Sequence, residues 1–350
     1  MIHGGEIHDK RIDLDFSVNL NPAGCPAKVR NALLEAAGHV GEYPDIDQQS
    51  FRIKTAMAEN KLAGGGFIGK GNVFGGNGAS ELIMAVIRLV APKKVLLPVP
   101  SFYGYLHAVK SLGDAQLSGY RLDSGSNFCL GEDFPDQITE DTDLVILGNP
   151  NNPTGRCIEE KLLERIVLRC SSCGCALVID ECFLHLSVGG TSSIRYLTSC
   201  SKLFVIDAYT KLFSIPGARV GYVISSEENI GKLRALLPEW NMSVFAQKAG
   251  EACAEVILEG DFVETSCRLA ECVRGRMERD FRELGFEVFS SDTNFILVYS
   301  DKRLYDFLLE RGILIRDGSN FAGLSKGYYR FAVKDEESYE RMKECFAFLT

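Results

Sequence analysis

The sequence predicts an α/β fold, in which a mostly parallel sheet is sandwiched by helices and followed by a smaller C-terminal α+β domain. From about residue 46 to 238, short apolar runs alternate with helical patterns, as in βαβ units. After Pro238 this order gives way to a long helical stretch, three short strand patterns and further helices. The length of 350 residues suits about two domains with a sizeable buried core.

Three segments are expected in chain order. Residues 1–45 are rich in Gly, Pro and Asn, and are interpreted as an N-terminal arm with one helix at 27–37. Residues 46–238 form the large domain, with strands at 94–97, 143–147, 176–179, 203–206 and 220–224. Residues 239–350 form the small domain, with helical segments through 263–284, at 302–311 and at the end, and strands at 295–298, 313–315 and 329–333.

Composition and charge exclude several classes of protein. With 46% apolar and 24% charged residues, the chain is not a disordered protein, a collagen or a coiled coil. The net charge of −9 argues against nucleic-acid partners, because no basic excess is available to neutralise phosphates. No signal peptide and no apolar run of about 18 residues is present, so we expect a cytoplasmic protein without membrane partners.

The twelve cysteines are interpreted as free thiols in a reducing compartment. Their spacing is irregular, and a chain of this size does not need a disulfide framework. The run Cys170-x-x-Cys173-x-Cys175 lacks a fourth ligand at a matching spacing. We therefore predict no metal site.

Polar and aromatic side chains follow four of the expected strands where each strand ends. In an open α/β sheet, ligands bind beyond the carboxyl ends of the strands. The residues at these ends include Phe102, Asn152, Asp180 and Lys211. We therefore expect a binding site at this edge of the sheet.

A glycine-rich segment offers an anion site. Gly75-Gly76-Asn77-Gly78-Ala79-Ser80-Glu81 precedes a helical run at 82–90, and its glycines let backbone amides approach an anion. Backbone amides at a helix N-terminus, here at Ala79 and Ser80, attract anions. Taken alone, the segment is more typical of an ordinary capped helix after a glycine turn, and it matches neither a P-loop nor a dinucleotide fingerprint.

Lys211 and its surroundings point to one cofactor. A lysine at a strand end in apolar company can have a lowered pKa and act as an amine nucleophile. Thr210 and Arg219 offer a hydroxyl and a guanidinium for a phosphate, and Asp180 offers a carboxylate for a protonated pyridine nitrogen. Pyridoxal phosphate needs this lysine, this acid, an anion cradle and an apolar face for its ring.

Two further residues complete that set. Phe102 can supply the apolar face, since aromatic stacking adds about 1 kcal/mol beyond burial. Asn152 can donate a hydrogen bond to the ring oxygen. Each feature alone also has an ordinary structural explanation: a surface lysine, a capping aspartate or a loop amide. Their joint order along the chain favours the cofactor.

With these motifs the sequence resembles the class I and II aminotransferases, which share the aspartate-aminotransferase fold. The matching motifs are Asn21-Pro22, Asn149-Pro150-Asn151-Asn152-Pro153-Thr154-Gly155, Asp180-Glu181-Cys182-Phe183, Thr210-Lys211 with Gly217-Ala218-Arg219-Val220-Gly221, and Arg330-Phe331. Within the family the chain is similar to the branch that contains histidinol-phosphate aminotransferase and threonine-phosphate decarboxylase. The resemblance implies an aspartate-aminotransferase-like large domain and covers nearly the whole chain.

The resemblance also implies a role for each matching residue. It makes Lys211 the Schiff-base lysine, Asp180 the pyridinium partner, Asn152 the contact of the ring oxygen, Phe102 the stacking ring, and Ala79, Ser80, Thr210 and Arg219 the holders of the cofactor phosphate. It implies a homodimer in which Tyr43 reaches the phosphate of the neighbouring site. Arg330 would grip the substrate α-carboxylate in a bidentate pair.

Three segments resemble threonine-phosphate decarboxylase in particular: His3-Gly4-Gly5, residues 15–22 and residues 315–321. The resemblance implies that Arg316 binds a substrate phosphate, with help from His3. A structural ion pair for Arg316 and a frayed terminal position for His3 remain open. Phe183, where many aminotransferases have tyrosine, also favours the decarboxylase.

The expected activity is therefore on a small phosphorylated amino acid, with decarboxylation of L-threonine O-3-phosphate placed first. The alternative is an aminotransferase of the histidinol-phosphate type, which transfers an amino group to a 2-oxo acid. The choice depends on which bond of the substrate Cα the site aligns for cleavage, and a sequence does not display that geometry.

Overall fold

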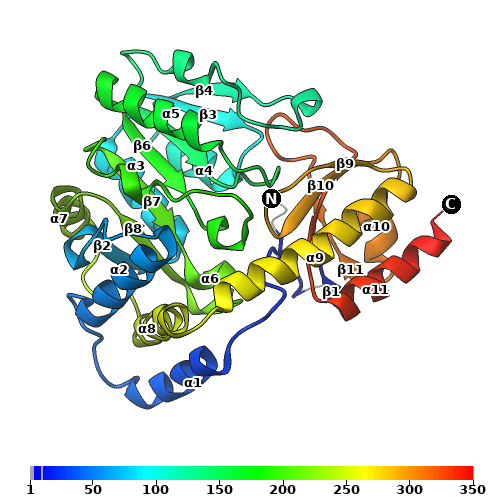
Figure 1. Ribbon diagram of the computed structural model, residues 1–350, viewed down its shortest axis with the longest axis horizontal. Helices are drawn as coiled ribbons and strands as arrows, with labels where there is room; N and C mark the ends of the chain where they lie inside the picture. The colour runs from blue at the N-terminus through cyan, green and yellow to red at the C-terminus, as the bar shows by residue number, and fades with distance from the viewer. Residues whose placement is uncertain (1–3, 9–10, 350) are drawn as a thin grey trace.

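The computed structural model describes residues 4–8 and 11–349 and contains two domains side by side (Figure 1). The large domain is built on a seven-stranded sheet and the small domain on a four-stranded antiparallel sheet. This arrangement confirms the predicted fold class: a mostly parallel sheet between helices, with a smaller α+β domain after it.

The large sheet has the strand order β2-β8-β7-β6-β5-β3-β4. Its strands are β2 (Val73–Asn77), β3 (Lys94–Val99), β4 (Gln116–Arg121), β5 (Leu144–Gly148), β6 (Ala176–Asp180), β7 (Leu203–Asp207) and β8 (Val220–Ile224). The five strands β4, β3, β5, β6 and β7 are parallel. β8 runs antiparallel to β7, and the edge strand β2 runs antiparallel to β8, so only β8 is reversed in the sheet. All five strands expected for the large domain are present within a residue or two of their expected bounds.

Two strands of this sheet, β4 and β2, were not predicted from the sequence. β4 has half-exposed side chains and therefore no apolar run. β2 contains Gly75 and Gly76, which a glycine turn before the helix would place outside the sheet. A Cβ on Gly75 would lie 2.2 Å from Met242 Sδ, and one on Gly76 would lie 2.6 Å from Leu82 Cδ2, so glycine is required by close packing within a strand.

Helices cover both faces of the large sheet. One face carries α3 (Ala79–Val90), α4 (Tyr103–Lys110) and α7 (Glu227–Leu236); the other carries α2 (Gln49–Ala63), α5 (Glu160–Cys173) and α8 (Val244–Glu259). The strands supply both cores by alternation: Leu144 and Ile146 of β5 face the first set of helices, and Val145 and Leu147 face the second. The continuous apolar strands of the sequence thus reflect burial on both faces.

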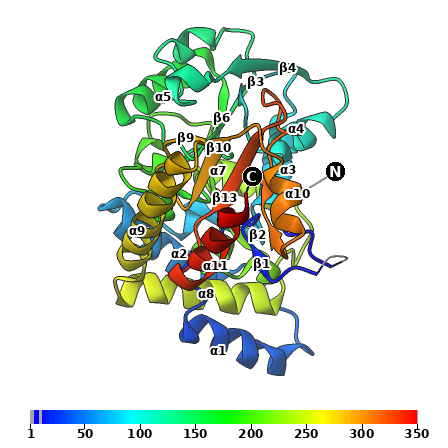
Figure 2. The same cartoon turned by 90° about the vertical axis from the view of Figure 1, so that its right-hand side faces the viewer.

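The small domain has the strand order β12-β13-β10-β9. Its elements are α9 (Phe262–Glu283), β9 (Glu287–Phe289), β10 (Phe295–Tyr299), α10 (Leu304–Leu309), β11 (Ile313–Leu314), β12 (Arg316–Asp317), β13 (Tyr328–Ala332) and α11 (Glu336–Cys345). Phe281 of α9 and Met342 of α11 join Phe331 of β13 in one core. Figure 2 shows the helices α9 and α11 and the strand β13 of this domain. The single strand expected at 313–315 is divided, because β11 pairs with β1 (Leu14–Asp15) and β12 pairs with β13.

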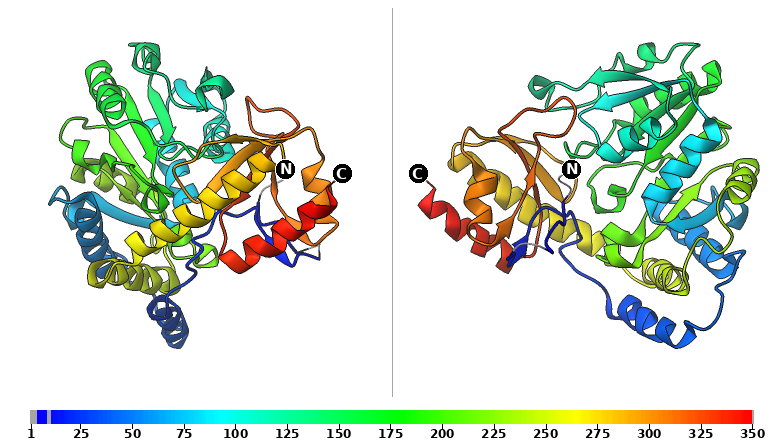
Figure 3. Two further views of the ribbon diagram at one scale, coloured as in Figure 1. Left: turned by 45° about the vertical axis from the view of Figure 1, so that its right-hand side comes forward. Right: turned by 180° about the vertical axis from the view of Figure 1, so that it is seen from behind.

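The N-terminal segment links the two domains. β1 adds to β11 of the small domain, and the chain then crosses to α1 (Ala27–Ala36), as Figure 3 shows in dark blue. Val29 of α1 belongs to the core that also contains Ala249 of α8 and Phe51 of α2. The expected boundaries after residues 45 and 238 stay predictions, and α8, beyond the second boundary, packs with the large domain.

Across residues 4–8 and 11–349, no helix has both the length and the apolar character needed to cross a membrane.

Candidate active site

A cavity of about 220 Å³ lies between the two domains, at the carboxyl ends of β3, β5, β6 and β7. Ten of the twelve residues predicted from the sequence line it: Ala79, Ser80, Phe102, Asn152, Asp180, Thr210, Lys211, Arg219, Arg316 and Arg330. The large domain contributes the first eight, and the small domain contributes the two arginines. The side chains that follow the strands thus lie together at one edge of the sheet, and their roles stay predictions.

Lys211 lies in α6 (Tyr209–Leu212), the single helical turn that follows β7. Burial lowers the pKa of the Lys211 amine to about 8, and the positive charges of Arg330 and Arg219 act in the same direction. The Nζ atom lies 5.9 Å from the ring centroid of Phe183. A neutral amine is consequently accessible near neutral pH, as a nucleophile or a base requires.

Asp180 ends β6 and is held through both carboxylate oxygens. Its Oδ2 accepts a hydrogen bond from the Tyr105 hydroxyl at 2.8 Å, and its Oδ1 accepts one from Cys182 N at 3.0 Å. Burial raises the pKa of Tyr105 well above its usual value, so that the phenol stays protonated and donates. The carboxylate is thus fixed at the wall of the cavity.

Tyr105 was not predicted from the sequence. A usable signal exists, because Tyr105 follows Phe102 by three residues in the helix that starts beyond β3. This spacing places both rings on the cavity side, where they make an edge-on contact with centroids 5.5 Å apart.

The N-terminus of α3 forms the second wall with Arg219. Gly78 precedes the helix at φ +81°, and a Cβ there would lie 2.4 Å from Arg219 Nη2. A Cβ on Gly221 of β8 would lie 2.6 Å from Ala79 N. These glycines let the arginine and the first amides of α3 approach each other closely. The first N–H groups of a helix have no partners within the helix, so this corner is suited to an anion.

Arg330 and Arg316 face each other across β13 and β12, where they are paired in register. Arg330 Nη1 donates to Asn152 Oδ1, and Nη2 donates to Ser17 O at 2.7 Å. Burial and the charge of Arg316 lower the pKa of Arg330 to about 9. Two buried guanidinium groups at one cavity wall favour an anionic ligand between or beside them.

Arg316 is oriented by its own turn. Its Nη2 donates to Asn320 Oδ1 at 2.7 Å, its Nη1 donates to Asp317 O at 2.5 Å, and its guanidinium lies 4.8 Å from the ring centroid of Phe321. The contacts hold the guanidinium at the cavity with an aromatic ring on one face.

Tyr43 does not line the cavity of its own chain. Tyr43 is 81% exposed, and its ring centroid lies 4.7 Å from that of Trp240 on the outer surface. Its role at a neighbouring site stays a prediction. His3 lies outside the described residues. Phe183 lines the cavity and packs edge-on against Phe295. Because this residue is a phenylalanine, it presents no hydroxyl to the cavity.

Asn19 is a further residue of the cavity that sequence reasoning did not single out. It is 2% exposed, and its Oδ1 has no hydrogen-bond partner among residues 4–8 and 11–349. Asn21, two residues on, has a structural role: its Nδ2 donates to Leu212 O at 2.7 Å and to Ser266 Oγ at 2.8 Å. Asn19 thus places its side-chain amide at the cavity, and Asn21 uses its side-chain amide to bind the last residue of α6.

Glu59, His185 and Asp207 form a buried cluster that does not line the cavity. His185 Nε2 lies 3.1 Å from Asp207 Oδ2 and 3.4 Å from Glu59 Oε1. Burial opposes protonation of the imidazole, but the two carboxylates outweigh it and raise the pKa of His185 well above its usual value. This is the only group in the described part of the chain with donors close enough for a metal. A protonated His185 between the carboxylates of Glu59 and Asp207 explains why these three side chains are close together without a metal ion.

Comparisons with known proteins agree with this geometry. Residues 11–344 match the family model described as aminotransferase class I and II. The chain is 28% identical to the threonine-phosphate decarboxylase of Salmonella typhimurium, over 97% of this chain and 94% of that one. Among solved structures, it is similar to the histidinol-phosphate aminotransferase of Clostridium acetobutylicum, with a TM-score of 0.85, 30% identity, and 96% and 98% of the two chains covered.

A second solved structure shares the fold. The L-threonine-O-3-phosphate decarboxylase of Porphyromonas gingivalis superposes with a TM-score of 0.82 at 20% identity, over 96% of this chain and 99% of that one.

Proposed function

Because the chain belongs to the class I and II aminotransferase family, we propose that it is a pyridoxal-phosphate enzyme that decarboxylates L-threonine O-3-phosphate. The observation that carries the proposal is the pair of buried arginines, Arg316 and Arg330, at the cavity that also contains Lys211. A substrate with a carboxylate and a phosphate offers one anion to each arginine.

The residues of the cavity fit pyridoxal phosphate. The anion corner of Ala79, Ser80, Thr210 and Arg219 would hold its phosphate, Asp180 its ring nitrogen, Asn152 its ring oxygen, Phe102 its ring face, and Lys211 its aldehyde carbon. The glycines at positions 78 and 221 support this fit, since side chains there would block the corner. When bound, the cofactor supplies an electron sink for the pair released by a bond to the substrate Cα.

The chain's own residues would then bind and orient the substrate. Arg330 with Asn152 binds the carboxylate, and Arg316, held by Asn320 and Phe321, binds the phosphate. Lys211, with its lowered pKa, moves the proton that replaces the departing carbon dioxide.

Two observations favour decarboxylation. The Salmonella relative named threonine-phosphate decarboxylase matches almost the whole chain. Phe183 leaves the cavity without the hydroxyl that many aminotransferases have at this position. An aminotransferase of the histidinol-phosphate type is the second candidate, supported by the Clostridium structure at 30% identity and by a Lys211 amine suited to taking a proton from Cα.

The assembly and compartment belong to the same proposal. A homodimer would use the exposed Tyr43 to complete the phosphate site of its partner. All twelve cysteines are unpaired thiols, which supports a reducing compartment such as the cytoplasm.

Product analysis tests the proposed reaction. The pyridoxal-phosphate-loaded protein is incubated with L-threonine O-3-phosphate, with and without 2-oxoglutarate. Carbon dioxide and aminopropanol phosphate released without any 2-oxo acid are the expected products. Glutamate formed from histidinol phosphate and 2-oxoglutarate, with no carbon dioxide, would reject decarboxylation and establish the second candidate.

A further inference from the structure

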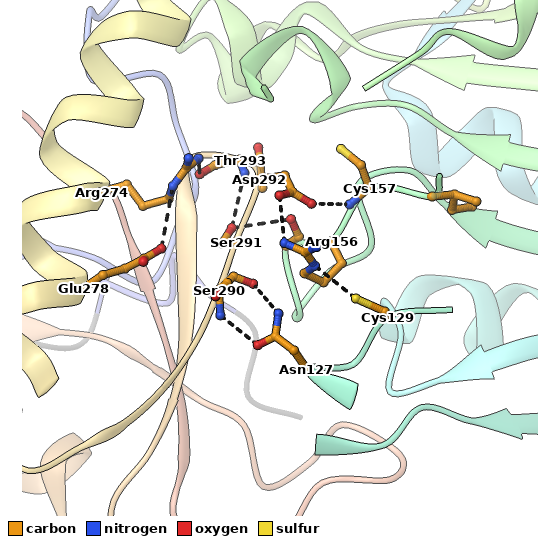
Figure 4. A network of polar contacts seen from close by, with 12 residues as sticks. Asn127, Cys129, Arg156, Cys157, Arg274, Glu278, Ser290, Ser291, Asp292 and Thr293 are labelled. Atoms are coloured by element: carbon orange, nitrogen blue, oxygen red, sulfur yellow. Dashed lines mark hydrogen bonds and ion pairs between the residues drawn. The ribbon is translucent and has the colours of Figure 1, made fainter. Parts of the chain in front are cut away.

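A turn of the small domain, residues 290–294 between β9 and β10, is bound by the large domain (Figure 4). Asn127 forms two hydrogen bonds with the backbone of Ser290: its Oδ1 accepts from Ser290 N at 2.8 Å, and its Nδ2 donates to Ser290 O at 3.2 Å. Val188 N donates to Asp292 O at 2.8 Å. The turn is therefore a fixed point of contact between the domains.

Within this turn, Asp292 contacts residues 155–157 of the large domain through its side chain and its backbone. Its Oδ1 lies 2.8 Å from Arg156 Nη1, and its Oδ2 accepts from Cys157 N at 2.8 Å. Its own backbone N–H donates to Gly155 O at 2.8 Å. Gly155 has φ +75°, and a Cβ there would lie 2.1 Å from Ser291 Oγ, so the loop and the turn are in direct contact. Asp292 thus holds residues 155–157 through side chain and backbone together.

The loop that Asp292 holds is the one that carries Asn152. Gly155 N donates to Asn151 O at 2.7 Å, and Asn151 N donates to Arg156 O at 2.9 Å, so the loop is closed on itself around Asn152. A displacement of residues 155–157 would therefore be transmitted to the Asn152 side chain.

The small domain contacts this loop at a second point, inside the cavity. Arg330 Nη1 donates to Asn152 Oδ1. Arg330 is paired with Leu297 of β10, the strand that begins three residues after Asp292. One sheet thus presents Arg330 to Asn152 and, through the turn before β10, fixes the loop that carries Asn152.

We propose that Asp292 is a positioning residue for the substrate carboxylate: it holds the Asn152 loop at the distance from Arg330 that a carboxylate requires. This inference rests on the proposed function, in which Arg330 and Asn152 bind that carboxylate. Asp292 is not among the described residues that line the cavity, so it acts through Asn152. Small misplacements of binding groups cost large factors in binding and rate, which makes such a contact measurable.

Three variants separate the contacts of Asp292. Asp292→Asn keeps an acceptor for Cys157 N but loses the charge opposite Arg156, Arg156→Ala removes the same pair from the other side, and Asp292→Ala removes both side-chain contacts. Glu160→Ala is the matched control, because it breaks another arginine–carboxylate pair, with Arg195 at 2.7 Å, that involves neither the turn nor the loop.

Two ligands that differ only in the α-carboxylate are compared. The Michaelis constant is measured for L-threonine O-3-phosphate, and the inhibition constant is measured for aminopropanol phosphate. In Asp292→Ala we expect the first constant to rise about tenfold and the second to stay within about twofold, since only the first ligand contacts Arg330. In Asp292→Asn and Arg156→Ala we expect rises of about threefold that do not add in the double variant. Glu160→Ala should change neither constant.

A merely structural role for Asp292 gives a different pattern. Equal weakening of both ligands with a lower melting temperature, or no change in either constant, would overturn the proposal. A wild-type protein that neither turns over the phosphothreonine nor binds the amine rejects the proposed function instead. The same variants are then measured with L-glutamate and 4-aminobutanoate, a pair that also differs only in the α-carboxylate.

Discussion

At the scale of single residues, the site depends on buried groups whose charge is set by neighbours. The Lys211 amine is surrounded by apolar side chains and two arginines, which together lower its pKa to about 8. Burial raises the pKa of Tyr105, so its phenol stays protonated and donates a hydrogen bond to the Asp180 carboxylate. The sequence places these groups at strand ends, and the surrounding packing decides their protonation.

The Lys211 pKa predicts how capture of the cofactor depends on pH. The neutral amine attacks an aldehyde, so the rate of pyridoxal-phosphate capture by stripped protein should rise about tenfold per pH unit below about 8 and level off above it. Arg330→Gln removes a charge that lowers this pKa, and its plateau should begin at higher pH. Stopped-flow absorbance measures the rate; a flat profile between pH 7 and 9 in the wild type would contradict the assignment.

Tyr105→Phe tests the anchoring of Asp180. The substitution removes a 2.8 Å hydrogen bond to a half-buried carboxylate without opening a cavity, and such bonds contribute about 1.5–3 kcal/mol. We expect the dissociation constant of pyridoxal phosphate to rise about tenfold, measured by titration of stripped protein.

The matched control for Tyr105→Phe is Tyr209→Phe. The Tyr209 hydroxyl donates to Thr55 Oγ1 at 3.2 Å in the core, and neither Tyr209 nor Thr55 lines the cavity. It should lower the melting temperature slightly and leave cofactor affinity unchanged. Equal cofactor affinities in both variants would mean that Tyr105 has no role in the site.

At the scale of elements, close approach of backbones builds the anion corner. β8 lies beside β2, and its Gly221 packs against the start of α3. Gly78, which joins β2 to α3, has φ +81° and ψ 167°, a region of backbone conformation that is essentially restricted to glycine. The corner is therefore a product of three elements that meet without side chains between them.

Gly78→Ala should disturb this corner specifically. The new Cβ would be strained by about 1–3 kcal/mol and would displace Arg219. We expect a lower melting temperature, measured by calorimetry, and at least tenfold weaker binding of pyridoxal phosphate, measured by absorbance titration.

Gly64→Ala provides the comparison for strain alone. Gly64 ends α2 at φ +71°, and no atom lies within 4 Å of a Cβ built there. It should lose about 1–2 kcal/mol of stability, the cost of a left-handed residue, with cofactor binding intact. If both variants weaken cofactor binding to the same degree, the contact with Arg219 is not responsible.

At the scale of the whole molecule, the site lies where two domains meet, and the proposal adds a second subunit. The small domain supplies the arginines, and the turn at residues 290–294 fixes one point of contact between the domains. Tyr43 and Trp240 form an exposed aromatic pair on the outer surface, and neither lines the cavity of their own chain.

Hybrid dimers test whether Tyr43 acts in the neighbouring site. Lys211→Ala removes the amine of its own site, and Tyr43→Ala removes the proposed contact in the partner's site. In a hybrid of the two, one site then contains both changes and the other contains neither. We therefore expect that mixing the two variants in equal amounts, with subunit exchange, restores up to a quarter of the wild-type activity per total protein. The restored sites should bind pyridoxal phosphate with the wild-type affinity. If Tyr43 acts within its own chain, or the protein is a monomer by sedimentation, mixing gives only the average of the parents.

Much of the site could be predicted from the sequence because of how parallel sheets are built. Phe102, Asn152, Asp180 and Lys211 follow four different strands, and parallel strands end at one edge. What the pattern could not show was the partner of each group. The hydroxyl of Tyr105 on Asp180 and the loop contact of Asp292 join residues 75 and 135 positions apart, respectively, and no local period encodes such contacts.

The amino-acid sequence by itself determined the fold class, the edge of the sheet that collects the chemistry, and the residue types present there. These follow from local periodicity and from the order of strands and helices. Only the tertiary structure decided that Gly75 and Gly76 lie in a strand, that β11 and β12 join different sheets, and that Arg316 and Arg330 face one cavity. Each of these depends on which distant segment packs alongside, because steric fit and hydrogen bonding between segments are settled only when the whole chain is folded.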